Sequence, residues 1–164
     1  MSCRKSLQDN YNGAARGTIL SVRIVFDTSS LITALRSNRG AAAEVLRLVL
    51  SGDLMILMDY KIAAEYRDVA LRPEHLAASR QTSRKILTLI EALEELAEPV
   101  QVSIKPRPLS SDPNDDMILD VAINGRADAL VTQNAKHFKR PGNQYGILVL
   151  SPVELLTALR KGEM

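Results

Sequence analysis

The chain has 164 residues, 21 basic against 19 acidic side chains and a single cysteine. This length is enough for one domain whose core needs neither a disulfide nor a structural metal. Cys3 has no partner, which excludes an internal disulfide and a cysteine-rich zinc site and is typical of a reducing compartment. A net charge of +2 gives no argument for a nucleic-acid partner, and four Tyr, two Phe and no Trp supply a base-stacking platform poorly.

The first 17 residues carry Arg4 and Lys5 with no apolar run behind them, so they do not read as a signal peptide. We expect residues 1–20 to be a disordered leader and residues 21–164 to form one folded domain. No stretch of the chain is apolar for long enough to cross a membrane. The sequence therefore predicts a cytoplasmic protein.

Short β-rich runs alternate with helical patterns along the first half of the chain. SVRIVF (21–26) predicts a buried strand, and AAAEVLRLVL (41–50) predicts a helix that ends at Ser51-Gly52. LMILM (54–58) predicts a second strand, and a helix is expected from 61 to 71.

The alternation continues in the second half. The expected elements are a helix over 79–98, an edge strand VQVSI (100–104), a helix from Asp112-Pro113, strands ALVT (129–132) and GILVL (146–150), and a helix over 152–160. Strands that alternate with helices pair in parallel through right-handed crossovers. The sequence thus predicts a three-layer α/β/α fold around a central, mainly parallel sheet.

Polar residues follow three of the predicted strands, at the sheet edge where such folds bind ligands. The segments are Asp27-Thr28-Ser29-Ser30 after the first strand, Asp59 after the second, and Thr132-Gln133-Asn134 after ALVT. An aspartate or serine that caps the next helix explains such residues equally well. Both interpretations stay open for Asp27.

Glu65 lies on the same face of its predicted helix as the apolar Ile62 and Tyr66. A carboxylate on a buried face needs a partner, because burying it alone is costly. The carboxylate is therefore expected to pair with an arginine such as Arg67 or Arg72, to be hydrogen-bonded, to bind a cation or to lie at the edge of the cleft.

Residues 112–120, DPNDDMILD, hold four aspartates in nine positions. Asp112 followed by Pro113 is a helix start, where negative charge is favoured by the helix dipole. Helical spacing places Asp115 at the head of the buried stripe and Asp116 and Asp120 on the solvent-facing side. We therefore expect only Asp115 among them to join a site.

Three carboxylates, those of Asp27, Glu65 and Asp115, are expected to point toward one region. Like charges gathered in a cleft need a cation, and oxygen ligands with no nearby cysteine and only two histidines favour Mg²⁺ or Mn²⁺ over zinc. An acidic metal cluster in an α/β domain is typical of phosphoryl chemistry, in which the metal activates water.

At these residues the sequence resembles the PIN-domain ribonucleases, and among them the toxin components of bacterial type II toxin–antitoxin systems (VapC-like). The resemblance covers about residues 22–151, and the order and spacing of its segments make it specific. The segments are VFDTSSLITAL (25–35), AAEYRDVALRP (63–73), DPNDDMILDVAINGRADALVTQN (112–134) and KHF (136–138).

The resemblance implies a PIN fold over residues 21–164 and cleavage of RNA by a Mg²⁺- or Mn²⁺-dependent endoribonuclease. It implies that the metal-binding catalytic acids are Asp27, Glu65 and Asp115. The residues that it assigns to hydrogen bonding around the metal and its water are Thr28, Ser29 and Thr132. A toxin role further implies an antitoxin partner and a homodimer.

Family members often carry a fourth acid in a T-G-D-like segment, and here that segment reads Thr132-Gln133-Asn134. Asn134 is expected to be a weaker metal ligand, so a second metal should be held less tightly. The basic residues Lys136, Lys139 and Arg140 follow, and we expect them to contact RNA phosphates.

Two other functions remain open. One is a catalytically weak or inactive metal- and RNA-binding module, in which the missing acid has abolished turnover. The other is a phosphatase with Asp27 as nucleophile, although that chemistry commonly uses a second aspartate where Ser29 stands. No Gly-rich phosphate loop is present, which removes most nucleotide-binding functions.

Overall fold

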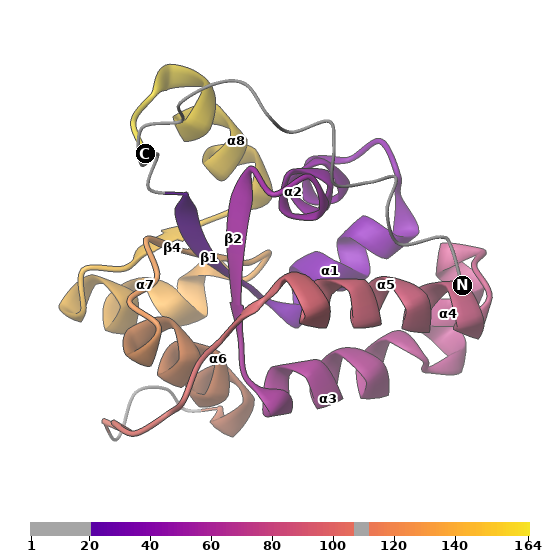
Figure 1. The fold of residues 1–164 in the computed structure, drawn as a ribbon, viewed down its shortest axis with the longest axis horizontal. Coiled ribbons are helices and arrows are strands. Elements are labelled where there is room, and N and C mark those ends of the chain that lie inside the picture. Colours follow the sequence, from indigo (N-terminus) through magenta and orange to yellow (C-terminus); the bar gives the residue numbers. More distant parts are fainter. Residues whose placement is uncertain (1–20, 107–111) are drawn as a thin grey trace, which may run out of the picture.

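The structure of the chain is a computed structural model that describes residues 21–106 and 112–164, and the leader expected at residues 1–20 lies outside them (Figure 1). Within the described residues five strands form one sheet in the order β3-β2-β1-β4-β5, and every neighbouring pair is parallel. The strands are β1 (Val22–Phe26), β2 (Leu54–Met58), β3 (Glu98–Pro99), β4 (Ala129–Val131) and β5 (Leu148–Leu150). The expected parallel sheet is confirmed.

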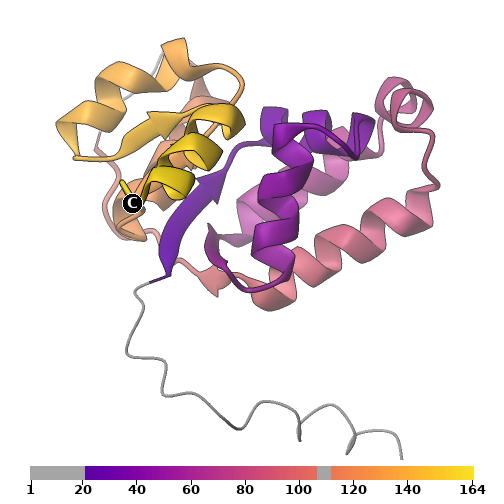
Figure 2. The same cartoon turned by 90° about the horizontal axis from the view of Figure 1, so that it is seen from above.

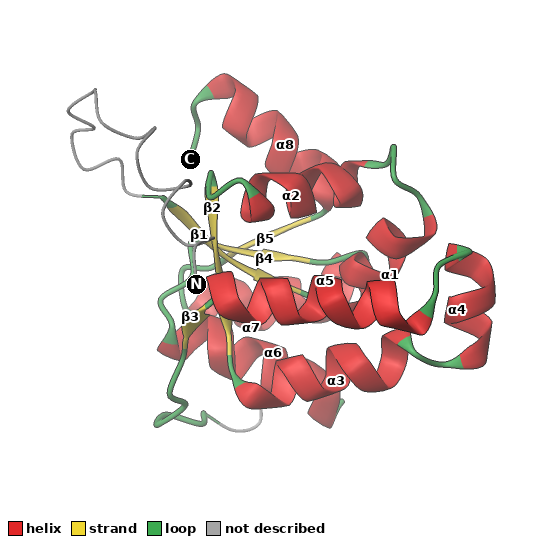
Figure 3. Cartoon of the chain, turned by 45° about the vertical axis from the view of Figure 1, so that its right-hand side comes forward, coloured by secondary structure: helices red, strands yellow, loops and turns green. Residues whose placement is uncertain are grey.

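Eight helices connect and cover these strands in the described part of the chain. They are α1 (Thr28–Arg36), α2 (Ala41–Leu50), α3 (Tyr60–Ala70), α4 (Pro73–Ser79), α5 (Ser83–Leu96), α6 (Pro113–Asn124), α7 (Ala135–Gln144) and α8 (Pro152–Lys161). Figure 3 shows α2 and α8 on one side of the sheet and α3, α6 and α7 on the other, which confirms the three-layer α/β/α fold. None of these helices is long and apolar enough to span a membrane.

Strand β1 is the centre of the molecule. Ile24, Val25 and Phe26 are fully buried, because β2 and β4 pair with β1 on its two edges and helices cover both faces. Seen from above, the orange and yellow C-terminal part lies on one side of β1 and the magenta to pink helices lie on the other (Figure 2). Residues that follow β1 therefore reach side chains from both halves of the chain.

Side-chain caps fix the starts of α3, α6 and α8. The Asp59 carboxylate accepts hydrogen bonds from the backbone nitrogens of Lys61 and Ile62, at 3.1 and 2.9 Å. The Asp112 carboxylate accepts one from Asn114 at 2.9 Å, with proline at the first helical position. Ser151 and Glu154 form a reciprocal capping box at α8.

The prediction of an edge strand at 100–104 is wrong. Strand β3 ends at Pro99, and only Val100 continues the pairing, with its nitrogen 2.9 Å from the Met58 carbonyl. The backbone nitrogens of Ser103 and Ile104 instead donate to the Asn124 side-chain oxygen at the end of α6, at 3.0 and 2.9 Å. The segment leaves the sheet because a side chain of α6 satisfies its backbone.

The helix predicted at 79–98 is shorter, and a separate helix precedes it. Helix α4 ends at Ser79, and Arg80 takes a left-handed conformation with φ of 55°. Thr82 then caps α5, its hydroxyl accepting from the Lys85 nitrogen at 3.3 Å.

Helix α7 has no counterpart among the predicted elements, because Pro141 and Gly142 lie inside it and mask the helical pattern. Gly142 is required by the packing. A Cβ at this position would lie 2.5 Å from a methyl of Val149 and 3.2 Å from the Ile147 carbonyl. This close contact packs the C-terminal half of α7 against β5.

Candidate active site

Asp27 lies where β1 ends, with its backbone nitrogen 2.9 Å from the carbonyl of Val131 in β4. It occupies the cap position of α1, yet its side chain makes no capping hydrogen bond. The carboxylate oxygen Oδ2 instead accepts from the hydroxyls of Ser29 at 2.5 Å and Thr132 at 2.7 Å. Since the side chain is 9% exposed, a largely buried carboxylate is aimed across the end of the sheet and does not cap the helix.

The two hydroxyls are themselves oriented by the backbone after β4. Ser29 Oγ accepts from the Gln133 nitrogen at 3.2 Å, and Thr132 Oγ1 accepts from the Asn134 nitrogen at 3.0 Å. A hydroxyl has one proton to donate, and each of these protons is directed at Asp27. The network therefore fixes the orientation of the Asp27 carboxylate, and the supporting role of Ser29 and Thr132 at a metal stays a prediction.

Glu65 is a partly buried carboxyl group on α3, and its Oε2 has no hydrogen-bond partner in the described residues. Burial raises the pKa of Glu65, and the charges of Asp27 and, more weakly, Asp112 raise it further. The nearby hydroxyl of Thr28 and the charge of Arg72 partly oppose this rise in pKa. Asp27 and Glu65 are thus close enough to repel each other, and their role as two acids of one site stays a prediction.

The ion pair considered for Glu65 does not form between described residues. Arg67 pairs with Glu94 through both of its terminal nitrogens. Arg72 pairs with Asp68 at 2.8 Å. Both arginines are therefore engaged elsewhere, and the carboxylate stays available to a cation.

Tyr66 explains why Glu65 lies beside Asp27. The Tyr66 ring is fully buried, and its hydroxyl donates to the carbonyl of Phe26, the last residue of β1. Burial raises the pKa of Tyr66 well above 10, with further contributions from Asp27 and Glu65, so the phenol stays protonated and keeps donating. This bond holds the middle of α3 against the end of β1.

Asp115 heads α6 with a side chain that is 17% exposed, and its Oδ2 lies 3.2 Å from Nδ1 of His137 on α7. The prediction that Asp116 and Asp120 face solvent is wrong, since they are 9% and 5% exposed. Helix α6 is covered on more than one side, because α7 and the segment 100–105 both pack along it. A helix enclosed in this way has no free polar face for these aspartates.

The acidic residues of the candidate site fit a divalent cation only in part. Asp27 and Glu65 contribute two mutually repelling carboxylates, and the unpaired buried oxygen of Glu65 suits a cation ligand. No group of three His, Cys, Asp or Glu side chains in the described ranges lies close enough to hold a metal ion. That Asp115 joins the other two acids therefore stays a prediction.

Asn134 and the basic residues after it lie at the N-terminal end of α7. Asn134 occupies the cap position, and its side chain makes no capping bond within the described chain. Lys136, Lys139 and Arg140 are exposed and share one face of the helix at positions i, i+3 and i+4. Their placement beside the carboxyl edge of the sheet is compatible with the expected phosphate contacts.

His137 belongs to the KHF segment, and the sequence assigns it no role beside Asp115. It is 60% exposed and contacts Asp115 from a helix that the sequence did not predict. Two histidines in the whole chain are a weak signal, and spacing alone could not have paired His137 with Asp115.

Comparisons with known proteins bear on the family and the fold of the chain. A family model described as the PIN domain matches residues 23–136. A chain in the crystal structure of VapBC2 from Rickettsia felis, bound to a DNA fragment from its promoter, is similar with a TM-score of 0.55 and 18% sequence identity. The match covers 79% of the present chain and 98% of that chain, and at this identity it shows the fold alone. No curated protein sequence matches the chain.

Proposed function

The chain belongs to the PIN-domain family, and from this membership we propose that it is a metal-dependent endoribonuclease that hydrolyses RNA phosphodiester bonds. PIN domains are generally nucleases. The observation that carries the proposal is the pair of partly buried, mutually repelling acids, Asp27 and Glu65, at the carboxyl edge of the sheet. We extend the PIN domain over residues 21–164, because β5 belongs to the same sheet and α8 packs on it.

The residues that would hold Mg²⁺ or Mn²⁺ are Asp27 and Glu65, completed by Asp115 and, more weakly, by the Asn134 amide. A divalent cation bound there supplies an activated water and neutralises charge on the phosphodiester. Ser29 and Thr132 keep the Asp27 carboxylate in one orientation by donating to Oδ2. Thr28, whose hydroxyl is buried beside Glu65, is proposed to bond to the water around the cation.

Phosphate contacts would come from α7. Lys136, Lys139 and Arg140 present three cations on an exposed helix face that begins next to Asn134. Contacts to phosphates position RNA without reading its sequence. These residues are proposed to hold the strand across the two acids.

Cleavage of a fluorogenic single-stranded RNA in Mg²⁺ or Mn²⁺ tests the proposal. Asp27→Asn and Glu65→Gln should each abolish cleavage and weaken Mn²⁺ binding measured by calorimetry, because each removes a charged ligand. Asp53→Asn is the matched control, since Asp53 is exposed just before β2, at the opposite edge of the sheet. Metal-dependent cleavage that survives both active-site substitutions would contradict the proposal.

A catalytically weak metal- and RNA-binding module is the second candidate. Two observations favour it: the described residues gather no group of three acids, and Asn134 stands where a fourth acid often occurs. The purified protein distinguishes the two functions. The nuclease cleaves RNA in Mn²⁺, whereas the binding module retards RNA on a gel and leaves it intact.

A toxin role with an antitoxin partner and a homodimeric state is proposed from the VapC-like resemblance and the fold shared with the VapBC2 structure. The proposed location of this RNA cleavage is the cytoplasm. Expression of the chain in bacteria should arrest growth, and Asp27→Asn should abolish the arrest. An antitoxin would copurify with the chain when the neighbouring gene is coexpressed. Equal growth arrest by the wild type and the Asp27→Asn variant would contradict a nuclease toxin.

A further inference from the structure

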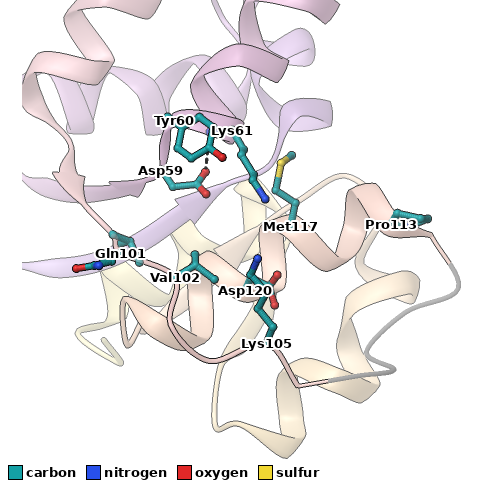
Figure 4. A pocket seen from close by; sticks show the side chains of 10 residues that line it. Asp59, Tyr60, Lys61, Gln101, Val102, Lys105, Pro113, Met117 and Asp120 are labelled. Atoms are coloured by element: carbon teal, nitrogen blue, oxygen red, sulfur yellow. Dashed lines mark hydrogen bonds between the residues drawn. The ribbon is translucent and has the colours of Figure 1, made fainter.

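A cavity of about 530 Å³ opens beside the candidate site, where β2 and β3 end (Figure 4). The first turn of α3, the segment 100–105 and helix α6 form its walls. The lining residues that matter below are Tyr60, Lys61, Val102, Lys105, Met117 and Asp120. In Figure 4, Tyr60 and Lys61 lie on the α3 side, and Met117 and Asp120 lie on the α6 side.

Tyr60 is an exposed aromatic side chain in a chain with few aromatic residues. It is 78% exposed, although a ring of this size is usually covered in part by its neighbours. The ammonium of Lys61 lies 6.0 Å from the ring centroid, so a cation accompanies an open aromatic surface. This combination is the one with which proteins stack unpaired bases.

The charges around the cavity separate its rim from its interior. Lys61 and Lys105 are exposed, whereas Asp120 in the inner wall is 5% exposed. The Asp59 carboxylate is bonded to the first turn of α3. The two exposed ammonium groups at the rim suit phosphates. The interior, lined in part by Val102 and Met117, suits an uncharged base.

Two helices, α3 and α6, carry residues of both the cavity and the candidate site. Tyr60 precedes Glu65 by five residues on α3, a separation of about 7.5 Å along the helix axis. On α6, Pro113 lines the cavity, and its neighbour Asp112 is close enough to raise the pKa of Glu65. A strand with one phosphate at Asp27 and Glu65 can therefore place a nearby nucleotide in the cavity.

We propose that this cavity is a nucleotide subsite, which binds one unpaired base of a single-stranded RNA against Tyr60 while Lys61 and Lys105 hold the flanking phosphates. Val102 and Met117 supply apolar wall for the base. The inference rests on the proposed function, because that function makes RNA the ligand. It adds a second binding region, separate from the basic face of α7.

Binding of a fluorescein-labelled, unstructured RNA to the full chain, followed by anisotropy in EDTA, tests the subsite without cleavage. Tyr60→Ala should lower the affinity at least about 5-fold, the lower end of the loss expected for one stacked base. Tyr60→Phe should keep the affinity. Tyr145→Ala is the matched control, because Tyr145 is also exposed, at 43%, but follows α7 on the way to the amino end of β5.

The lysines are tested by salt dependence. Replacing both Lys61 and Lys105 by alanine should flatten the slope of log affinity against log salt by about 1.4, or about 0.7 for each lost phosphate contact on a single strand. Lys161→Ala, an exposed lysine of α8, should leave the slope unchanged.

Wild-type affinity in Tyr60→Ala would overturn the subsite and leave the cavity to a protein partner. An equal loss of affinity for the same RNA in duplex form would also overturn it, because a paired base cannot enter. The binding and cleavage assays together distinguish failure of the nuclease proposal from failure of the subsite proposal. Tyr60-dependent binding without cleavage in Mn²⁺ rejects the nuclease and keeps the subsite, whereas cleavage with Tyr60-independent binding does the reverse.

Discussion

Glu65 carries a buried carboxylate oxygen that has no hydrogen-bond partner in the described residues. An unsatisfied buried polar group destabilises a folded protein by about 1–3 kcal/mol. The sequence showed this conflict directly, because Glu65 shares a face with Ile62 and Tyr66. It could not show that Arg67 is engaged by Glu94, since that contact depends on where α5 lies, whereas the pair of Arg72 with Asp68 is local at i,i+4.

Glu65→Gln should therefore stabilise the metal-free protein while abolishing cleavage. Burial and Asp27 raise the pKa of Glu65 in the folded state above its ordinary value of 4.5. The proton is thus bound more tightly by the folded chain, so the stabilising contribution of Glu65 is complete below pH 4.5 and is lost as pH rises through the folded pKa. In urea unfolding with EDTA, the variant should gain about 1 kcal/mol at pH 7 and nothing at pH 4.

Added Mg²⁺ provides the control for this prediction. A cation that binds only the folded state raises the free energy of unfolding. The wild type should gain stability from millimolar Mg²⁺, and Glu65→Gln should not. A variant less stable than the wild type at pH 7 in EDTA would show that the carboxylate has a partner after all.

Asn134→Asp should lower the metal concentration needed for half-maximal cleavage. The substitution adds a fourth acid at the end of β4, at an exposed position that begins α7 and tolerates negative charge. Gln133→Glu is the matched control, since it adds the same charge one residue earlier at another exposed position. An equal metal dependence for Asn134→Asp and the wild type would show that position 134 lies outside the metal site.

At the scale of the elements, the sequence predicts the buried apolar strands, but it does not predict which faces of a helix are covered by other segments. VRIVF and LMILM form β1 and β2, because short and largely apolar runs suit the strands of a parallel sheet covered on both faces. Helix α6 was predicted as a helix with one polar face, yet Asp116 and Asp120 are buried. Which face of a helix is covered depends on segments distant in the sequence, here 100–105 and α7.

Asn124 is the residue that attaches segment 100–105 to α6. Its side chain accepts from the nitrogens of Ser103 and Ile104 and donates to the carbonyls of Ile104 and Asp120, at 2.7 and 2.8 Å. Asn124→Ala should cost about 0.5–1.5 kcal/mol in the free energy of unfolding, because it removes these hydrogen bonds and leaves the exposed backbone groups to water. Hydrogen exchange should accelerate at Ser103 and Ile104.

The matched control for this prediction is Asn143→Ala, on the exposed side of α7. It should change neither stability nor exchange. Unchanged exchange at Ser103 and Ile104 in Asn124→Ala would mean that the sheet or the cavity wall holds the segment without Asn124.

At the scale of the whole molecule, the site exists only where distant parts of the chain meet. Asp27 and Thr132 are separated by 105 residues, and their hydrogen bond joins the ends of β1 and β4. The sequence predicted both residues, because parallel strands bring their carboxyl ends to one edge. It could not predict that His137 contacts Asp115, since that contact requires α7.

Thr132→Val tests whether this long-range bond orients the catalytic carboxylate. The change keeps the shape of a fully buried side chain and removes the hydroxyl that donates to Asp27 and accepts from the Asn134 nitrogen. Loss of a group that orients a metal ligand typically lowers metal affinity or activity by about 10–100-fold. We expect the cleavage rate to fall by a factor in this range, with RNA affinity in EDTA unchanged because no phosphate contact is lost.

The control is Thr157→Val, which removes an exposed hydroxyl bonded within α8 and should leave cleavage intact. If Thr132→Val cleaved RNA at the wild-type rate, Asp27 would be oriented by Ser29 alone.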